Sequence, residues 1–187
     1  EVFTPPLADA TSMVQKVRNA RPDLMLVLTT NVPDTKLILE KLNEMGLGKG
    51  RVAVITNGGH MGAPELLNVV GKDLMEGVMV IIANWGGKGQ EALIKDFKVK
   101  QKEPWMTQDS ISSYGDMWIF KEAMEQAKSA DPKKVAAAMR AMDGTAAAKY
   151  FPGGTLTFEQ NARPPAPDLV ILQVQMRDPH THYPPPL

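Results

Sequence analysis

Two short polar stretches follow apolar runs of the sequence and could bind a small polar ligand. The first is Thr29-Thr30-Asn31, after residues 24–28, and the second is Asn57-Gly58-Gly59-His60, after residues 52–56. Their hydroxyl and amide groups can hydrogen-bond a ligand, and glycine allows the backbone to approach it closely. Each stretch also precedes a predicted helix, whose N-terminus favours a carboxylate. Ordinary helix capping by Thr and Asn explains the same residues, so both explanations stay open.

The sequence shows no pattern of residues that predicts catalysis, a metal site or a cofactor. Cysteine is absent, and there are only three histidines. No Ser-His-Asp order with an elbow glycine occurs, and no close carboxylate pair recurs at predicted strand ends. Asp178, His180 and His182 alternate near the C-terminus, but a proline-flanked tail is a poorly preorganised metal site. We therefore predict no catalytic residue, no metal ligand and no cofactor.

Composition narrows the possible partners. The chain has 187 residues, with 21 Lys+Arg and 21 Asp+Glu, so its formal net charge is zero. Nucleic acid is therefore excluded as the main partner, because phosphate binding needs a basic excess. The longest purely apolar stretch, residues 78–83, is far shorter than the roughly 20 residues of a membrane span. The chain begins with Glu1 rather than Met, so we expect a processed form or a fragment.

The first half of the sequence predicts a parallel α/β sheet. Apolar runs at residues 24–28, 52–55 and 77–82 are typical of strands buried on both faces of such a sheet. Helical patterns separate them at residues 11–21, 33–45 and 64–70, and residues 2–4 could form another short strand. Strands that alternate with helices in this way indicate βαβ units.

The second half is mainly helical. Helices are predicted at about residues 90–98 and 110–130, with a third opened by Asp131-Pro132. Strand signals return at residues 155–158 and 169–175. The long helix carries large apolar residues that need a sheet or further helices to cover them. We therefore expect part of the fold to lie outside this chain, and we expect the region of residues 108–142 to expose apolar surface.

The order of these elements resembles a known family. Residues 11–24, TSMVQKVRNARPDL, resemble the D-F-x-x-x-V-x-x-I-x-x-x-x-P-D segment of type I periplasmic binding proteins, the branched-chain amino acid receptors of ABC transporters. Further matches follow in order over nearly the whole chain. They are residues 42–47 (LNEMGL), Gly71 with residues 76–78 (EGV), residues 113–116 (SYGD), 123–127 (AMEQA), 154–158 (GTLTF) and 171–175 (ILQVQ).

The resemblance implies an incomplete two-lobed receptor, of which this chain is the C-terminal half. Residues 1–83 would form part of the second lobe, residues 84–160 a helical part of the first lobe, and residues 161–187 a return strand and tail. The implied function is non-enzymatic: an extracytoplasmic, periplasmic receptor of an ABC transporter binds a small carboxylate (an organic acid) or an amino-acid-like ligand between its lobes and docks on a membrane permease. The helical region would pack against the missing N-terminal half or against a second copy.

The resemblance also places ligand contacts. Thr29, Thr30 and Asn31 would contact the ligand from one side, and the stretch from Asn57 to His60 from the other. Trp85 and Tyr114 are further candidates, as crossover and first-lobe aromatics. In amino-acid receptors of this family an acidic side chain of the second lobe commonly pairs with the ligand ammonium, and neither stretch contains one.

The lack of an acidic residue favours a small carboxylate without an amine over a zwitterionic amino acid. Two other classes of function stay open: a ligand-sensing domain of a regulator with the same fold, and an enzyme on a doubly wound α/β sheet.

Overall fold

The computed structural model describes all residues except 88, 152–153, 155, 159–169 and 176–187. The chain divides into two compact units. Unit 1 comprises Glu1–Ile82 and Ile171–Leu187, and unit 2 comprises Ala83–Val170. Each unit is described by itself.

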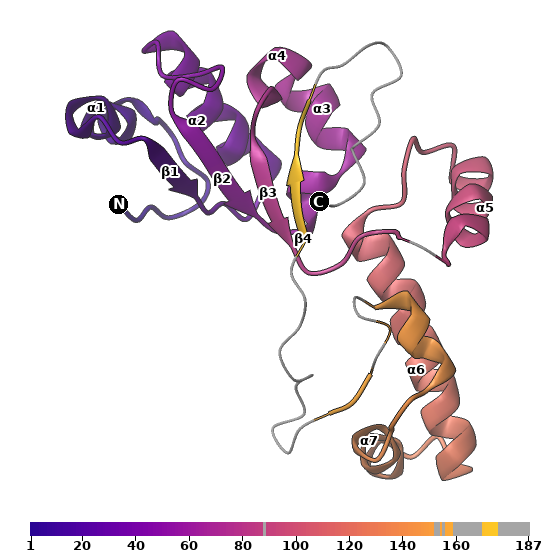
Figure 1. The fold of residues 1–187 in the computed structure, drawn as a ribbon. Coiled ribbons are helices and arrows are strands. Elements are labelled where there is room, and N and C mark those ends of the chain that lie inside the picture. The colour runs from indigo at the N-terminus through magenta and orange to yellow at the C-terminus, as the bar shows by residue number, and fades with distance from the viewer. Residues whose placement is uncertain (88, 152–153, 155, 159–169, 176–187) are drawn as a thin grey trace. The chain divides into compact units, whose positions relative to one another are not determined.

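Unit 1 is built on a sheet with the strand order β1-β2-β3-β4 (Figure 1). The strands are β1 (Leu24–Val27), β2 (Ala53–Asn57), β3 (Met79–Ile82) and β4 (Val170–Gln173). β1 pairs with β2 in parallel, and β2 pairs with β3 in parallel. This arrangement confirms the predicted parallel α/β sheet.

The helices of unit 1 begin and end at residues suited to those positions. They are α1 (Thr11–Ala20), α2 (Val32–Glu44), the short 3-10 helix η1 (Gly59–Gly62), α3 (Pro64–Val70) and α4 (Lys72–Met75). Pro64 opens α3, where its missing N–H costs nothing, and Gly71 ends it with a positive φ of 93°. α1 differs, because Ala10 holds its N-cap position and offers no side-chain acceptor, while Thr11 donates to both carboxylate oxygens of Asp9.

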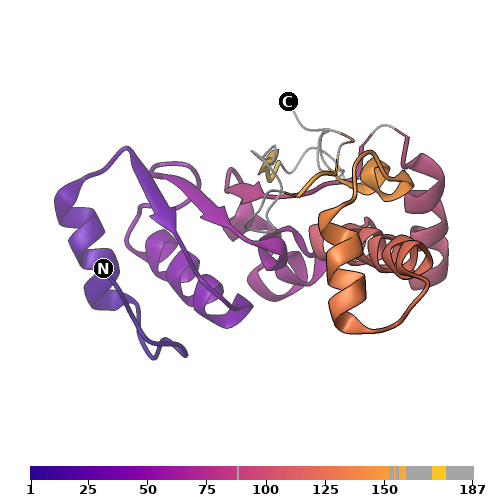
Figure 2. The ribbon, with the colours of Figure 1, turned by 90° about the horizontal axis from the view of Figure 1, so that it is seen from below.

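The two faces of this sheet differ sharply in burial. One face is packed under helices and buries Val54, Thr56, Val80, Ile82 and Leu172. The other leaves apolar side chains more than half exposed: Leu24 at 51%, Leu26 at 59%, Leu28 at 57% and Ile171 at 56%. The prediction that these strands are buried on both faces was therefore wrong. In Figure 2, α2 lies on one side of β1 and β2. We call the exposed side the open face.

Residues 2–4, predicted as a possible strand, have no strand conformation. A strand needs a neighbouring strand to which its backbone can bond. β1 is an edge strand that pairs with β2, and residues 2–4 are not paired with it or with another described strand. Val2 is 96% exposed.

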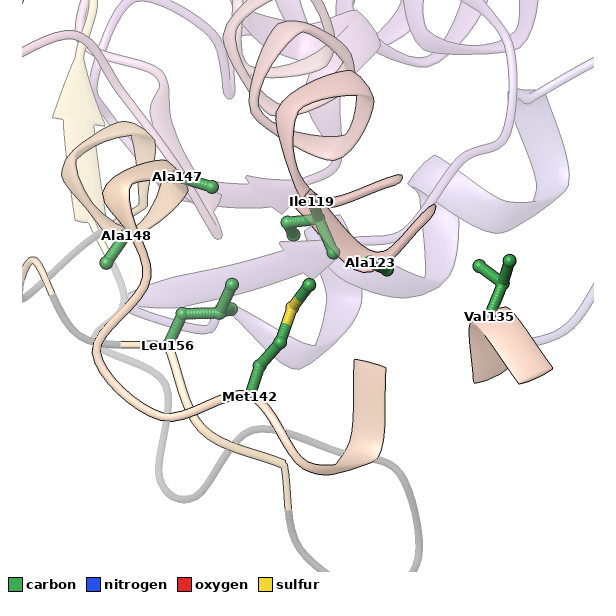
Figure 3. Packing of buried hydrophobic residues seen from close by; sticks show 7 residues of the cluster. All are labelled: Ile119, Ala123, Val135, Met142, Ala147, Ala148 and Leu156. Carbon is green, nitrogen blue, oxygen red and sulfur yellow. The ribbon is translucent and has the colours of Figure 1, made fainter. Parts of the chain in front are cut away.

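Unit 2 is helical around a small apolar core. Its elements are α5 (Glu91–Gln101), α6 (Gln108–Ala127), α7 (Pro132–Arg140) and the 3-10 helix η2 (Ala146–Tyr150). Thr107 caps α6 by accepting from the Ser110 N–H, and Asp131 caps α7 by accepting from Lys133 and Lys134. Figure 3 shows the core, formed by Ile119, Ala123, Val135, Met142, Ala147, Ala148 and Leu156.

One side of α6 remains uncovered. Ile111 is buried, and Trp118 packs against the core in part. Tyr114, Met117, Phe120 and Met124 are exposed, so the expected apolar surface between residues 108 and 142 is present. At the predicted strand of residues 155–158, Thr157 forms a single antiparallel bridge with Asp143, and Thr155 lies outside the described residues.

Candidate functional site

The two polar stretches of unit 1 meet at the carboxyl ends of β1 and β2. Thr29 follows β1 and is buried, and His60 lies in η1, just after β2. The Thr29 Oγ1 atom is 3.5 Å from His60 Nε2. Because β1 and β2 are parallel neighbours, their carboxyl ends lie at the same edge of the sheet. In open α/β sheets this edge is where ligands bind.

Thr35 anchors this pair from the first turns of α2. Its Oγ1 atom lies 2.6 Å from Thr29 Oγ1, 3.0 Å from the Asn31 carbonyl oxygen and 3.5 Å from the Met61 sulfur. A hydroxyl has one proton to donate. One consistent arrangement has His60 Nε2 donating to Thr29, Thr29 to Thr35, and Thr35 to the carbonyl. The buried hydroxyls thus fix both stretches against α2.

Asn31 caps the N-terminus of α2. Its contacts are those of a helix cap, which is one of the two explanations that the sequence analysis gave for this residue. Its Oδ1 accepts from the Asp34 N–H at 2.9 Å, and its Nδ2 donates to Asp34 Oδ2 at 2.7 Å. The other carboxylate oxygen of Asp34 accepts from the Leu7 N–H at 2.9 Å. Asp34 is 1% exposed. The acid nearest to the two stretches is therefore buried, with both oxygens bonded inside unit 1.

Gly58 determines where His60 lies. Its φ of 98° and ψ of 151° belong to a region that is essentially restricted to glycine. Its N–H donates to the Ile81 carbonyl at 3.2 Å, which holds the turn against β3. A Cβ added here would lie 3.0 Å from two atoms of the His60 ring. Glycine therefore supplies both the backbone conformation and the space for the imidazole.

The remaining predicted residues of unit 1 differ in burial. Thr30, three residues after β1, and Asn57, the last residue of β2, are exposed. Gly59 is buried within η1, whose turn is closed by the Met61 N–H donating to the Gly58 carbonyl at 3.1 Å. Thr30 and Asn57 are therefore the accessible polar residues of the two stretches, whereas Thr29 is buried.

Trp85 and Tyr114 lie in unit 2. Trp85 lines a hollow of about 620 Å³, together with residues that include Gln90, Thr145 and Lys149. Tyr114 lies on α6 and packs edge-on against Tyr150, with ring centroids 5.0 Å apart. Their contact with a ligand remains a prediction.

Sequence reasoning missed the supporting residues Thr35, Met61 and Leu7. Thr35 could have been found, because it lies four residues after Asn31 and so on the same side of the helix. The contact between Leu7 and Asp34 joins residues 27 positions apart, and no local pattern marks it.

The described residues contain neither a metal cluster nor a membrane helix. They hold no group of three or more His, Cys, Asp or Glu residues that could bind a metal ion. Within the same residues no helix is long and apolar enough to cross a membrane. The predicted tail with Asp178, His180 and His182 lies outside the part that the structure describes.

Comparison with known proteins identifies the family. A family model described as "Periplasmic binding protein" matches residues 1–179, so the chain belongs to this family. The resemblance seen in the sequence is thereby confirmed. No curated protein matches the chain.

Solved structures show the same fold at low identity. A leucine-binding protein from Thermotoga maritima has 18% identity and a TM-score of 0.77, covering 99% of this chain and 50% of its own. A periplasmic ligand-binding protein of a branched-chain amino acid ABC transporter from Burkholderia xenovorans has 16% identity and a TM-score of 0.72, covering 97% and 48%.

A third structure carries a ligand. The solute-binding protein of an ABC transporter from Rhodopseudomonas palustris, solved in complex with benzoate, has 14% identity and a TM-score of 0.67. The match covers 93% of this chain and 46% of that one. This chain therefore spans about half the length of the solved structures that it matches.

Proposed function

We propose that this chain is the C-terminal half of an ABC-transporter receptor that binds a small carboxylate between two lobes outside the cytoplasm. The observation that carries the proposal is the contact between Thr29 and His60, which joins two polar loops at the carboxyl edge of the sheet. In this proposal residues 1–83 belong to the second lobe, residues 84–160 to the first, and residues 161–187 return to the second.

The groups that would bind the ligand are the exposed ones around this contact. Asn57 and Thr30 offer an amide and a hydroxyl to solvent, and the backbone at Gly58 and Gly59 can approach a ligand without side-chain obstruction. The N-terminus of α2, a helix of 13 residues, adds a partial positive charge beside Thr30. All of these features favour an oxygen-rich or anionic group.

The state of Asp34 argues against an ammonium group in this part of the site. A buried ammonium needs a carboxylate, because leaving it unpaired costs several kcal/mol. Both oxygens of Asp34 already accept hydrogen bonds, and neither loop contains another acid. A solved structure of similar fold holds benzoate, an acid without an amine, and this supports the proposal. We therefore propose a simple organic acid as the ligand class.

The mechanism is binding and lobe closure, without catalysis. A ligand that contacts both lobes stabilises the closed arrangement by its differential affinity for the two states. Trp85 and Tyr114 would provide the contacts of the other lobe. The closed form would then dock on a membrane permease, which releases the solute for transport.

The test uses the receptor with both halves of the fold and a set of simple organic acids. We expect His60→Ala and Asn57→Ala to weaken binding of the best acid about tenfold each, because a hydrogen bond to a charged group contributes about 1.5–3 kcal/mol. Asn68→Ala is the control, since Asn68 is an exposed amide on α3. Unchanged affinity in both site variants, measured by calorimetry, would refute the proposed site.

A further inference from the structure

The ring of His60 is joined to α2 by a chain of three polar contacts. His60 Nε2 lies 3.5 Å from Thr29 Oγ1, which lies 2.6 Å from Thr35 Oγ1. Thr35 Oγ1 lies in turn 3.0 Å from the Asn31 carbonyl oxygen. Thr29 and Thr35 are 6% and 1% exposed. Because buried polar groups are hydrogen-bonded to one another, we expect each of these contacts to hold a proton.

The direction of this chain follows from the number of protons in it. A carbonyl oxygen can only accept, so Thr35 donates its single proton to Asn31. Thr29 then donates to Thr35, since two oxygens 2.6 Å apart need a proton between them. Because Thr29 has used its own proton, it accepts from the Nε2–H group of His60. In the reverse direction Thr35 would donate to Thr29, and the contact with the carbonyl would hold no proton.

We infer that Thr35, acting through Thr29, keeps a proton on Nε2 of the neutral His60 ring, so that a carboxylate at this ring binds together with one further proton. A neutral imidazole has one N–H group, so Nδ1 is then an acceptor. A carboxylate is also an acceptor, and a hydrogen bond between two acceptors requires one of them to gain a proton. Thr35 is thus a positioning residue. This inference deepens the proposed function and rests on an acid as the ligand.

Nδ1 lies on the side of the ring that faces Gly58. A Cβ added to Gly58 would lie 3.0 Å from Nδ1, whereas glycine places no side chain there. Nε2 lies instead toward the buried Thr29. The proposed ligand approaches the backbone at Gly58 and Gly59, and it would therefore meet Nδ1 of the ring.

Few charged side chains lie on the elements around His60. β3 and α3 pack against η1; β3 has the sequence MVII, and the charged residue of α3 is the exposed Glu65. α2 contributes Asp34, whose oxygens both accept hydrogen bonds within unit 1, and Lys36, which lies 3.8 Å from Glu40. Among these groups only an imidazole ordinarily changes its charge between pH 5 and 8. A proton taken up with the ligand near neutral pH is therefore assigned to His60.

The first arm of the test needs no ligand and uses the receptor with both halves of the fold. Long-range ¹H–¹⁵N NMR correlations at about pH 8.5, about two units above the ordinary histidine pKa, show which ring nitrogen carries the proton. His60→Gln assigns the signals. We expect the proton on Nε2 in the native receptor and in Thr35→Ser. In Thr35→Val the Thr29 hydroxyl loses its acceptor and donates to Nε2, so the ring proton should move to Nδ1.

The control for this arm is Thr56→Val. Thr56 is 1% exposed, like Thr35, but its hydroxyl has no hydrogen-bond partner among the described residues. Its replacement by valine should therefore leave the ring proton on Nε2.

The second arm measures the proton taken up with the ligand, using benzoate and 4-methylpentanoate as probes. Calorimetry in buffers of different ionisation enthalpy counts the protons bound with each acid. We expect the affinity of the native receptor to fall about tenfold from about pH 7.5 to about pH 8.5, because one proton enters with each ligand. Thr35→Val should reduce this fall to less than about threefold, since its ring already has a proton on Nδ1. Thr35→Ser and Thr56→Val should keep the native pH dependence.

Three results would overturn the inference. They are a ring proton on Nδ1 in the native receptor, a ring proton that stays on Nε2 in Thr35→Val, and an affinity for the bound acid that does not change with pH. The first and third concern the native receptor, so the inference stays falsifiable where Thr35→Val does not fold. If neither acid binds while the ring proton moves as expected, the acid ligand of the proposed function is refuted and the positioning role of Thr35 is supported.

Discussion

The two faces of the sheet in unit 1 consist of similar apolar residues, but those of one face are buried and those of the other are exposed. On the covered face Val80 and Ile82 are 0% and 2% exposed, whereas on the open face Leu24 and Leu26 exceed 50%. Both faces are apolar, so burial here follows from which face the crossovers cover and not from residue type. The open face is thus an apolar surface on which Leu24 and Leu26 stay exposed among the residues that the structure describes.

The largest effect should come from truncating the covered face. We expect Ile82→Ala to lower the free energy of unfolding by about 2–5 kcal/mol, because it leaves a cavity in a packed core. Leu26→Ala removes a similar volume from the open face and should change it by less than about 0.5 kcal/mol. Urea denaturation of the 187-residue chain measures both. Similar losses of unfolding free energy in the two variants would contradict the difference in burial between the two faces.

A smaller loss of stability should come from Gly58, whose two roles can be separated: its glycine-only backbone conformation and the space that it leaves for the His60 ring. Gly58→Ala forces alanine into a glycine conformation and should cost about 1–3 kcal/mol. Gly71 has nearly the same angles, φ 93° and ψ 146°, but nothing lies within 4 Å of an added Cβ. Gly71→Ala should therefore cost a similar amount, while only Gly58→Ala displaces the His60 ring.

The histidine NMR signals provide the measurement for this pair. The His60 resonances should shift in Gly58→Ala and stay in place in Gly71→Ala. Equal shifts, or none in either variant, would contradict the positioning role of Gly58.

Two buried threonines on the covered side of the sheet differ in their hydrogen bonding, and so should differ in the stability that each loses on substitution. Thr35 and Thr56 are each 1% exposed, but the Thr35 hydroxyl has three neighbours at bonding distance. The Thr56 hydroxyl has no hydrogen-bond partner among the described residues. Thr35→Val should therefore cost about 1–2 kcal/mol, whereas Thr56→Val should be neutral or stabilising. Thermal unfolding of both variants checks this, and a larger loss in Thr56→Val would contradict it.

The smallest effect concerns a carboxyl group on α6 of unit 2. Partial burial raises the pKa of the Asp116 carboxyl above its ordinary value. The folded state then holds this proton more tightly, so the stabilisation is present below the unfolded pKa of about 4 and is lost as pH rises through the folded pKa. Asp116→Asn should thus raise the melting temperature slightly at pH 7 and not at pH 3. A melting temperature that Asp116→Asn raises at pH 3 and not at pH 7 would contradict this prediction.

The sequence predicted the parallel strands because their apolar runs and the helices between them are local patterns. It could not reveal the open face, since Leu26 and Ile82 occupy similar apolar runs and differ only in tertiary cover. The loops of the candidate site were found from their position after strands. The contact of Thr29 with Thr35 and the bonds of Asp34 depend on side-chain geometry, which periodicity does not encode.

The central claim is that the carboxyl edge of unit 1 receives an acid and offers no partner to an amine. Calorimetric titration of the receptor with both halves, using leucine and 4-methylpentanoate, tests it most directly, because the two ligands differ only in the ammonium group. The account predicts that 4-methylpentanoate binds at least tenfold more tightly, and that His60→Ala weakens this binding. Tighter binding of leucine, unaffected by His60→Ala, would contradict it.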